Sequence, residues 1–600
     1  MGELVFIDTI VRKAATNAVK TLFGAELAPD AIQLQETRKE FDADITLVVF
    51  PLTKLSKKGP EETGKLLGDY LTANEPGIAS YSVVKGFLNM VMSDAFWTGF
   101  MQQVAQEAHY GFSATASRSR VLVEYASPNT NKPLHLGHLR NIFLGHSVAN
   151  VLAANGHIAT RVQIINDRGI HICKSMVAWK HFANGATPES SGMKGDKFVG
   201  HYYVLFDKSL KEQVKAGVAN GLSEEDATQS APIMQEAQEM LRQWEARDVE
   251  VIDLWKRMNG WVYEGFNATY AAMGVTFDKL YYESDTYLLG KKEVEEGLAR
   301  GIFFRKEDGS IWVDLTEDGL DQKALLRKDG TAMYITQDIG TAILRFSEFP
   351  DAEYQIYTVG NEQEYHFKVL FRILNKLGFA QAGKCYHLSY GMVELPEGKM
   401  KSREGTVVDA DDIMDEMARE AAAVSAEQGK LDGLTDDEKS ALHRMIGMAA
   451  LKFFLLRVDP RKNMLFNPRE SIDFNGDTGP FVQYTYVRTG AVLRKAAETS
   501  IELPAAVPSV ALQTPEKRVL RKLHAWPQVV QQASREYNPA LIAHYCIELA
   551  RDFNGFYQDN PIVRESDVAL RGFRLHLVKS TGRVIKDALG LLGIEVPERM

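Results

Sequence analysis

Two histidines separated by two residues are the first candidates for chemistry in this chain. His135 and His138 flank Gly137 in the run VLVEYASPNTNKPLHLGHLRN at 121–141, where a β-rich segment enters a proline-containing loop and then a helix. A helix N-terminus has unpaired N–H groups and a partial positive charge, and imidazoles add hydrogen-bond donors. This combination suits a nucleotide phosphate, so we predict that all three residues bind one.

The histidine pair has two other interpretations. A metal site of the HExxH type would need a different spacing and an intervening glutamate, and neither is present. The pair could also be a structural contact that is satisfied inside the fold. The glycine between the imidazoles, the Ser127–Asn129 turn before them and the helix after them favour phosphate contact. We therefore predict no metal site.

A short basic loop, GKMKSREG at 398–405, is the second candidate. Such a sequence can be an ordinary solvated turn. Its position after a strand in the second half of the predicted sheet favours a loop that folds over a triphosphate and neutralises the charge developing on pyrophosphate. The residues expected to contact the nucleotide there are Lys399, Met400, Lys401 and Ser402.

Scattered acidic and polar residues form a third group. Glu124 ends a predicted strand, Tyr334 and Asp338 lie in AMYITQDIG, and Gln363 lies in VGNEQEYH. Carboxylates at the ends of strands suit a cationic ligand such as a guanidinium, which takes planar, bidentate hydrogen bonds. Each residue alone has a solvated or structural interpretation, and only a shared cleft would make them a site.

The elements predicted around these residues alternate between strands and helices. Strands are expected at 121–125, 161–165, 354–360 and 385–393, and a helix is expected from Leu136 to Ala154. Because such units are joined by right-handed crossovers, the pattern predicts a doubly wound parallel α/β sheet. Ligands bind such a sheet at the carboxyl ends of its strands, where the histidine pair would lie.

The chain is expected to be multidomain, because 600 residues exceed what one core can organise. We predict an N-terminal α+β domain at 1–115, the sheet domain at 119–440 and an all-α helical bundle at 441–600. Residues from about 175 to 320 are rich in Glu, Lys and Gln and are predicted to form a helical insertion between two halves of the sheet. The elements expected in the first domain are a strand at 46–52, a helix at 64–74 and a strand at 81–93.

The bulk composition is that of a globular protein, with 45% hydrophobic and 25% charged residues. No apolar run approaches the roughly 18 residues of a membrane span. The charged N-terminal segment lacks the apolar core of a signal peptide. The three cysteines, Cys173, Cys385 and Cys546, match no zinc or disulfide spacing. These features predict a cytoplasmic protein without membrane contact.

The net charge of −10 argues against nucleic acid as a partner, but the charge is unevenly spread. Residues 481–600 contain 16 Lys and Arg against 12 Asp and Glu, a balance of +4 that leaves −14 for the rest of the chain. A basic module on an acidic body is what a local nucleic-acid surface would look like. Chance variation among solvated faces explains the charge equally well, and both interpretations stay open on charge alone.

Taken together, the motifs resemble those of class I aminoacyl-tRNA synthetases. HLGH is a form of that family's HIGH motif, and GKMKSREG resembles its KMSKS loop. The similarity is closer to arginyl-tRNA synthetases, and the matches run in the family's order from about residue 84 to the last residue. The runs that carry this closer similarity are VEYASPNTNKPLHLGHLRN, DGTAMYITQDIGTAI, YTVGNEQEYHFKVLF, GDTGPFVQYTYVR and LLGIEVPERM.

This resemblance implies a Rossmann-like catalytic sheet of the HUP type and a two-step reaction. The carboxylate of L-arginine would attack the α-phosphorus of ATP, which releases pyrophosphate and leaves arginyl-adenylate. The 2′-hydroxyl of the 3′ terminal adenosine of tRNA(Arg) would then take the arginyl group. The implied cofactors are ATP and its Mg²⁺. The enzyme would need no nucleophile of its own, so positioning and charge stabilisation would supply the catalysis. We expect a monomer that needs bound tRNA before it activates arginine.

The resemblance also implies roles for individual residues. His135 and His138 would contact the ATP phosphates, and Lys399 would hold its loop over the triphosphate. Within the bundle, Phe481 and Tyr484 would be candidates for stacking on the anticodon. The N-terminal domain would contact the corner of the tRNA. The residues implied to bind arginine are Glu124, Asn129, Tyr334, Asp338 and Gln363, with Glu124 and Asp338 facing the guanidinium.

Three positions depart from the family pattern. Ser402 stands where the second lysine of the KMSKS-type loop is usual, so the catalytic charge would come from Lys132, just upstream of HLGH, or from Lys401. Gln337 replaces the arginine that the family commonly has just before the aspartate of the motif that contains Tyr334 and Asp338. Arg168 stands where a tryptophan often follows Asp167. The last two affect details of the pocket and leave the reaction unchanged.

Three rival functions share parts of this pattern. The first is another class I synthetase, for glutamine, glutamate or cysteine. A pocket with paired carboxylates argues against acidic substrates, and the lack of clustered cysteines argues against a zinc-bound cysteine pocket. A small nucleotidylyltransferase shares the HxGH chemistry but would not need the basic helical domain. A catalytically silent tRNA-binding paralogue is disfavoured by the presence of His135, His138 and Lys399.

Overall fold

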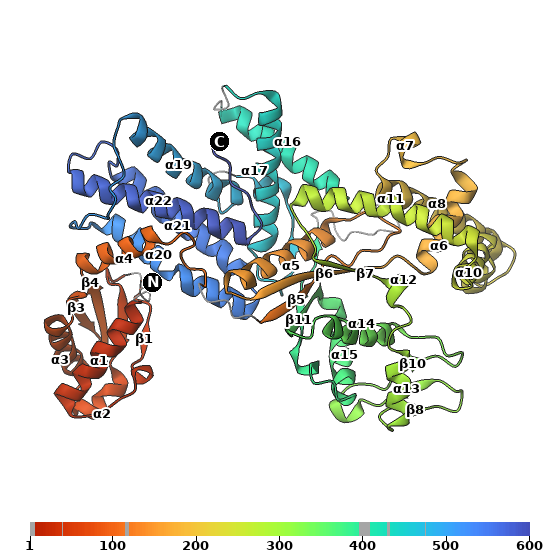
Figure 1. Ribbon diagram of the computed structural model, residues 1–600, viewed down its shortest axis with the longest axis horizontal. Coiled ribbons are helices and arrows are strands. Elements are labelled where there is room, and N and C mark those ends of the chain that lie inside the picture. The colour runs from red at the N-terminus through yellow and green to blue at the C-terminus, as the bar shows by residue number, and fades with distance from the viewer. Residues whose placement is uncertain (1–5, 39, 114–118, 395–407, 429–432, 474–475) are drawn as a thin grey trace.

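The computed structural model describes residues 6–38, 40–113, 119–394, 408–428, 433–473 and 476–600. A parallel sheet lies near the centre of an elongated molecule, with the N-terminal domain and the helical insertion at opposite ends (Figure 1). The C-terminal helices lie between the N-terminal domain and the sheet (Figure 1). No helix in these described stretches is long and apolar enough to cross a bilayer.

The N-terminal domain is a four-stranded antiparallel sheet with helices, in the strand order β1-β2-β4-β3. The strand predicted at 81–93 is instead a hairpin, because the chain reverses at Lys85 and Gly86, whose φ angles are 51° and 77°. Two consecutive residues with positive φ are what a tight hairpin turn needs. The elements are α1 (Ile7–Phe23), β1 (Leu34–Gln35), β2 (Ile45–Val48), α2 (Thr53–Ser56), α3 (Pro60–Asn74), β3 (Ile78–Val84), β4 (Phe87–Met92) and α4 (Asp94–Gln106).

The central sheet has five parallel strands in the order β12-β11-β5-β6-β7. The order reverses between β5 and β11, so the chain first builds outward from β5 in one direction and then returns to build in the other. In open α/β sheets the crevice at this switch point, outside the carboxyl ends of the strands, is where ligands bind. The five strands are β5 (Arg120–Glu124), β6 (Ile158–Ile165), β7 (Lys279–Tyr282), β11 (Ala352–Gly360) and β12 (Cys385–Tyr390).

The predicted insertion at about 175–320 includes one strand of the main sheet. Strand β7 pairs with β6 at the edge, and its four residues, KLYY, begin with a lysine. A short, partly polar edge strand does not produce the hydrophobic run of a central strand, so the sequence pattern missed it. The helices before it are α6 (Ile170–Phe182), α7 (Pro188–Ser191), α8 (Gly195–Ala219), α9 (Glu224–Ser230), α10 (Pro232–Glu245) and α11 (Val249–Met273).

A small antiparallel sheet in the order β10-β9-β8 follows β7, below the main sheet in Figure 1. This sheet also departs from the predicted helical insertion. The chain then enters α14 and returns to the main sheet through β11. The elements of this part are α12 (Glu283–Thr286), α13 (Lys291–Ala299), β8 (Phe304–Arg305), β9 (Ile311–Val313), β10 (Lys323–Leu326), α14 (Tyr334–Glu348) and α15 (Glu364–Lys376).

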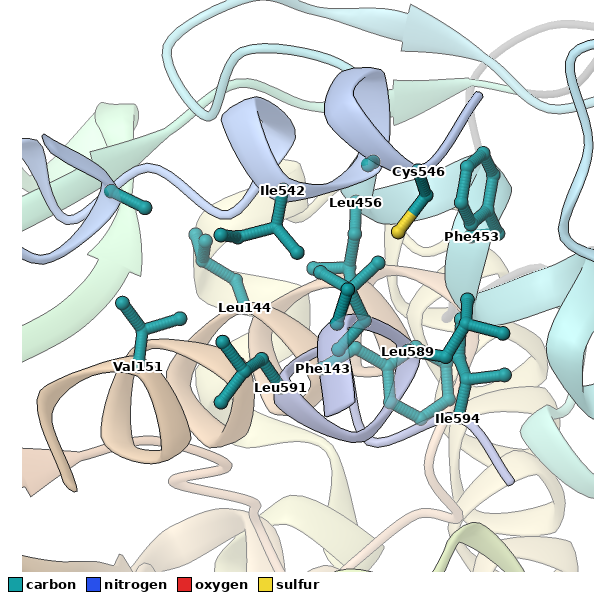
Figure 2. Packing of buried hydrophobic residues seen from close by; sticks show 14 of the residues in the cluster. Phe143, Leu144, Val151, Phe453, Leu456, Ile542, Cys546, Leu589, Leu591 and Ile594 are labelled. Carbon is teal, nitrogen blue, oxygen red and sulfur yellow. The ribbon is translucent and has the colours of Figure 1, made fainter. Parts of the chain in front are cut away.

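Helix α5 (Leu136–Ala154) has the bounds that the sequence predicts, and it is buried on nearly every side. At Gly145 an added Cβ would lie 2.4 Å from Cβ of Tyr125, so the helix backbone lies directly on the residue that follows β5. Its other side packs into the C-terminal helices, where Phe143, Leu144 and Val151 meet residues of α17, α21 and the C-terminal end (Figure 2). A helix that is apolar all round is a core helix.

The C-terminal part is a helical bundle, as predicted. One short departure is β14 (Met464–Leu465), which pairs in parallel with β13 (Val393–Glu394) and so ties the bundle to the end of the sheet domain. The helices are α16 (Ala410–Gln428), α17 (Asp436–Leu456), α18 (Pro468–Ser471), α19 (Gly479–Glu498), α20 (Thr514–Glu536), α21 (Ala540–Asp559) and α22 (Val568–Leu591).

Candidate active site at the strand ends

The switch point of the sheet is held in shape by one side chain of α5. Asn141 accepts the backbone N–H of Ala126 through Oδ1 at 2.6 Å and donates through Nδ2 to the carbonyl of Thr358 at 2.7 Å. Ala126 follows β5 with a φ of 73°, an uncommon conformation for a residue other than glycine. The bond to Asn141 stabilises this turn and ties the ends of β5 and β11 to the helix between them.

His135 is the N-cap of α5, and the two predicted histidines are brought together there. The Nδ1 atom of His135 accepts the N–H of Gly137 at 3.2 Å, and the Nδ1 atom of His138 accepts the N–H of His135 at 3.1 Å. The ring centroids are 3.9 Å apart. Because each Nδ1 is an acceptor, a neutral ring carries its proton on Nε2. Each imidazole therefore has an Nε2–H donor to offer.

Electrostatics keep both imidazoles neutral. Burial, with a smaller contribution from the Lys132 ammonium, lowers the pKa of His135 to about 4. Burial, His135 and Lys132 lower the pKa of His138 well below its usual value. Lys132 thus lies close enough to act on both rings. The helix N-terminus supplies further positive potential without a titrating group.

Gly137 is required by the geometry of this cap. A Cβ at that position would lie 3.1 Å from Cε1 and 3.2 Å from Nδ1 of the His135 ring. These distances are shorter than ordinary van der Waals contact, so a side chain would push the imidazole out of place.

The predicted residues Lys399, Met400, Lys401 and Ser402 lie outside the described residues, but the chain on both sides of 395–407 contacts α5 or its cap. Downstream, Leu136 N–H donates to the carbonyl of Val408 at 3.3 Å, and Ala410 N–H donates to that of Leu134 at 2.9 Å. Upstream, the buried Arg140 guanidinium donates to the carbonyl of Gly391 at 2.6 Å. The described flanks of this segment therefore both lie beside the first turns of α5.

Two carboxylates and a tyrosine after β7 and at the start of α14 influence one another electrostatically. Glu283 begins α12 directly after β7 and is buried, and Asp338 and Tyr334 share one face of α14 because they are four residues apart. The pKa of Glu283 is raised to about 7, chiefly by burial, with Arg168 lowering it and Asp167 and Asp338 raising it. Tyr334 is 75% exposed, and the pKa of this hydroxyl is raised by partial desolvation and by Glu283 and Asp338.

These two carboxylates differ in how they are satisfied. Asp338 Oδ2 contacts Nε2 of His366 at 2.6 Å. Within the described part of the chain, no side chain forms a hydrogen bond or ion pair with the carboxylate of Glu283. A buried carboxylate beside a second carboxylate is poised to receive a cation. The arrangement fits a planar guanidinium that could meet both groups.

Glu124, predicted to face a guanidinium from outside, meets one from the chain itself. Its Oε2 accepts from Arg345 of α14, and Oε1 accepts from the Ser127 hydroxyl at 3.2 Å. Both partners of the ion pair are buried, with side chains 8% and 1% exposed. The Arg345 guanidinium also lies 4.8 Å from the ring centroid of Tyr281. The pair holds α14 against the end of β5.

The other two residues predicted to bind arginine lie at neighbouring strand ends. Asn129 is exposed and forms a parallel bridge with Asn166, so it follows β5 beside the end of β6. Gln363 is exposed at the end of a single 3₁₀ turn after β11. His366, the partner of Asp338, lies three residues farther along. Glu124, Asn129 and Gln363 therefore lie at the carboxyl ends of β5, β6 and β11, and Asp338 joins them through His366. Tyr334 instead lies near Glu283, after β7.

Aromatic residues also gather on the bundle, far from the sheet in sequence. Phe481 and Tyr484, the predicted stacking residues, are partly buried on α19. The Arg488 guanidinium lies 5.0 Å from the ring centroid of Tyr484 and 4.9 Å from that of Tyr557, on α21. A partly exposed aromatic face with an arginine is suited to stacking on nucleic-acid bases.

Sequence reasoning missed Glu283, Arg345, Arg488 and Tyr557. A signal existed for Glu283, because it directly follows β7 just as Glu124 ends β5, but β7 itself was not predicted. Arg488 stands one helical turn beyond Tyr484, so its place on the same face could be predicted from the helix period. Arg345 and Tyr557 had no local signal, since their partners lie far away in the chain.

Comparisons with known proteins agree over the whole chain. Residues 100–467 match the family described as tRNA synthetases class I (R), catalytic domain, and residues 482–600 match the DALR anticodon binding domain. The arginine–tRNA ligase of Bacteroides thetaiotaomicron is 54% identical over 586 residues, covering 97% of this chain and 98% of that protein. The arginine–tRNA ligase of Phocaeicola vulgatus is 55% identical over 605 residues, covering 99% of this chain and all of that protein.

A solved structure shares the architecture. The arginyl-tRNA synthetase of Thermus thermophilus superposes with a TM-score of 0.77 at 26% identity, and the match covers 99% of this chain and all of that one.

Proposed function

This chain belongs to the arginyl-tRNA synthetase family, and on that premise we propose how its residues join L-arginine to tRNA(Arg) at the expense of ATP. Family membership rests on relatives more than 50% identical over nearly the full length. The observation that carries the residue assignment is that two neutral imidazoles meet at the N-terminus of α5, beside the carboxyl end of β5, while Glu283 follows β7 of the same sheet and interacts with Asp338 of α14.

Activation begins with the ATP phosphates at the start of α5. His135 and His138 donate from Nε2 to phosphate oxygens as charge builds on them, and the N-terminus of α5 adds positive potential. The neutral state of the rings supports this role, since their donors are already in place and no proton has to be lost or gained. The arginine carboxylate attacks the α-phosphorus, the bond to the β-phosphate oxygen breaks, and pyrophosphate leaves with the electron pair.

The positive charges that stabilise the leaving pyrophosphate are assigned to lysines. Lys132 acts electrostatically on both imidazoles, which supports a place beside the phosphates. Lys399, with Met400, Lys401 and Ser402, is assigned to the triphosphate on the family motif and on the position of its flanking residues beside α5. Lysine suits this task as a compact cation.

Mg²⁺ is assigned to the nucleotide, because no group of three His, Cys, Asp or Glu in the described part of the chain is placed to hold a metal ion. Mg²⁺ commonly binds through substrate phosphates, where it neutralises part of their charge. We expect it to arrive with ATP. The residues of this chain then orient the phosphates around it.

The substrate guanidinium is assigned to Glu283 and Asp338, which supports a revision of the role of Glu124. Because Glu124 forms an ion pair with Arg345, we assign it a structural role. The pair fixes the position of α14 relative to the sheet, and with it the positions of Tyr334 and Asp338. Asn129 and Gln363 are left to orient the α-amino and carboxylate groups. Two carboxylates matched to one planar cation favour arginine over neutral or acidic amino acids.

Transfer to tRNA requires that one chain bind both the 3′ terminal adenosine and the anticodon of the tRNA. The terminal adenosine reaches the adenylate at the strand ends, and its 2′-hydroxyl attacks the arginyl carbonyl while AMP leaves. The anticodon is assigned to the face of α19 and α21 that carries Phe481, Tyr484, Arg488 and Tyr557. All of these surfaces come from a single chain, so we propose a monomer, working in the cytoplasm.

The test is ATP–pyrophosphate exchange with each of the twenty amino acids, with and without tRNA(Arg). We expect exchange with arginine alone and only when tRNA is present. Gel filtration with light scattering reports the oligomeric state in the same preparation. Exchange driven by another amino acid would contradict the assignment, whereas arginine-driven exchange without tRNA would remove only the tRNA requirement.

A further inference from the structure

The first turns of α8, in the helical insertion, lie against the loop that leads into His135. A Cβ added at Gly200 would lie 2.7 Å from Cδ of Pro133 and 3.6 Å from Cα of Lys132. The helix backbone therefore touches the chain two residues before the N-cap of α5. The absence of a side chain at Gly200 allows this approach.

The same turns of α8 also hold the chain on the other side of His135. Lys197 Nζ lies 3.2 Å from Oδ1 of Asp409 and 2.8 Å from Oδ1 of Asp412. One turn earlier, Lys194 Nζ lies 2.6 Å from Oδ2 of Asp411. Asp411 also accepts from the Thr269 hydroxyl of α11 at 2.9 Å. Two lysines of the insertion thus pair with three acidic residues at the start of α16.

Asp409 stands directly opposite His135. The two residues form an antiparallel bridge, which is flanked by the backbone bonds from Leu136 N–H to Val408 and from Ala410 N–H to Leu134. Asp409 also caps α16, because its Oδ1 accepts the N–H of Asp411 at 2.8 Å. The position of Asp409 therefore determines the position of the backbone segment that pairs with His135.

The ionised form of the Asp409 carboxylate is stabilised by the Lys197 ammonium. The Asp409 side chain is 12% exposed, and burial raises its pKa, with Asp411 raising it further and Lys197 lowering it. Its Oδ2 has no hydrogen-bond partner among the described residues. An ionised carboxylate left unpaired in such a place is costly, so the segment would shift or the carboxyl would take up a proton.

We propose that Lys197 is a positioning residue for adenylate formation. Through Asp409 it fixes the backbone that pairs with His135, and so fixes where the imidazole presents its Nε2–H to the nucleotide. Holding the nucleotide-binding histidine from outside is then one role of the helical insertion. This inference rests on the proposed function of His135.

The experiment compares Lys197→Met, Lys197→Arg, Asp409→Asn and the double variant Lys197→Met/Asp409→Asn. Lys211→Met is the matched control, because Lys211 lies on the same helix and pairs with Asp207 on its surface. The readouts are kcat and the KM values for ATP and arginine in ATP–pyrophosphate exchange with tRNA. A displacement of about 1 Å at a reacting group can cost on the order of 100-fold in rate.

For Lys197→Met we expect kcat to fall about tenfold or more, while KM for arginine stays within about twofold, because the defect lies at the phosphate side. Lys197→Arg should recover most of the rate, since it restores a cation at the same place. The double variant should be more active than Lys197→Met alone, because the amide that replaces the Asp409 carboxylate can still cap α16 but leaves no unpaired charge. The Lys197→Met defect should also grow as the pH rises, because the loss of the Lys197 cation raises the pKa of Asp409 further and its unpaired carboxyl ionises with rising pH.

A second measurement, NMR spectroscopy of the histidine rings, reports the environment of His135 without catalytic turnover. In protein labelled at histidine, the His135 ring signals, assigned with His135→Ala, should shift in Lys197→Met and stay in place in Lys211→Met. Wild-type kcat in Lys197→Met, or a double variant whose loss equals the product of the two single losses, would overturn the inference. The proposed function is judged separately, on arginine-dependent exchange by the wild-type protein, and the ring signals test the positioning claim whatever that result.

Discussion

The imidazole rings of His135 and His138 lie with centroids 3.9 Å apart, and each ring accepts a backbone N–H through Nδ1. The pair is therefore a fixed set of two outward donors rather than a proton shuttle. Two adjacent neutral rings avoid the repulsion that two imidazolium ions would suffer at this distance.

Removing one imidazole should slow the chemical step. We expect His138→Ala to lower kcat for ATP–pyrophosphate exchange by roughly 100- to 1,000-fold, the loss typical of one preorganised donor to developing negative charge. KM for arginine should change little, because the carboxylates proposed to bind the guanidinium are untouched. Steady-state exchange with tRNA present measures both. An unchanged kcat would show that the ring does not contact the phosphates.

The pH dependence should come from the arginine side. Burial raises the pKa of Glu283 to about 7, so its carboxyl is protonated below that pH and ionised above it. The value of kcat/KM for arginine should therefore fall as the pH drops from about 7 to about 5.5 and level off above 7. His135, with its pKa lowered to about 4, stays neutral over this range and should add no loss.

The matched variant for this profile is Glu283→Gln. It should have a low kcat/KM for arginine that no longer varies between about pH 5.5 and pH 7, while kcat/KM for ATP follows the wild-type curve. A profile in Glu283→Gln that still rises toward neutral pH would assign the titration to another group.

Asp338→Asn should weaken arginine binding selectively. The substitution removes the charge that is proposed to face the guanidinium, and it also changes the contact with His366. We expect KM for arginine to rise at least about tenfold, the cost of roughly 1.4 kcal/mol from one charge-assisted hydrogen bond, with KM for ATP nearly unchanged. Asp351→Asn is the control, because Asp351 pairs with Arg120 at the opposite ends of the strands. Equal rises in both KM values would show that Asp338 does not bind the guanidinium.

The buried pair between Glu124 and Arg345 should govern stability as well as arginine binding. Arg345→Met leaves the Glu124 carboxylate buried without its cation, which typically costs about 3–5 kcal/mol. We expect a lower melting temperature and a higher KM for arginine. Glu124→Gln/Arg345→Met should recover part of the melting temperature, since no unpaired charge remains. Calorimetric melting compares the three proteins, and a double variant no more stable than Arg345→Met would argue against a pairing role.

Tyr484→Ala should weaken tRNA binding. The Tyr484 ring lies beside Arg488, which also faces Tyr557, and this group forms the proposed anticodon face. Loss of one stacked base costs about 1–3 kcal/mol, so KM for tRNA should rise about tenfold or more. A tRNA that lacks the anticodon arm supplies the control, because it should be charged equally by both proteins. A defect that persists with the shortened tRNA would place the effect outside the anticodon face.

The sequence alone was sufficient for the elements whose signals are local. Helix α5 has its predicted bounds because its cap, its glycine and its apolar residues all lie within one short run. The pairing of β5, β6, β11 and β12 follows from the alternation of strands and helices and from the handedness of their connections.

What sequence reasoning missed depends on contacts between distant segments. Strand β7 is four residues long at the edge of the sheet, so its hydrophobic pattern is too short to recognise. Glu283 becomes a candidate only when β7 is placed beside β6, because its burial there raises the pKa of its carboxyl. Glu124 was correctly placed at a strand end, yet its partner Arg345 is 221 residues away in the chain. No spacing rule relates those two positions.

The burial of α5 has a consequence for how separable the parts of this protein are. The helix carries the histidines at its N-terminal end, and farther along it the Ser147 hydroxyl donates to the carbonyl of Leu591 at 2.8 Å. Figure 2 shows Phe143, Leu144 and Val151 of α5 packed beside Leu589, Leu591 and Ile594. Removing the last helices would expose one buried face of α5, the helix whose N-terminus carries the imidazoles. The catalytic domain and the anticodon-binding domain therefore both depend on α5 for their packing. Neither domain can be exchanged for that of another protein without redesigning the other.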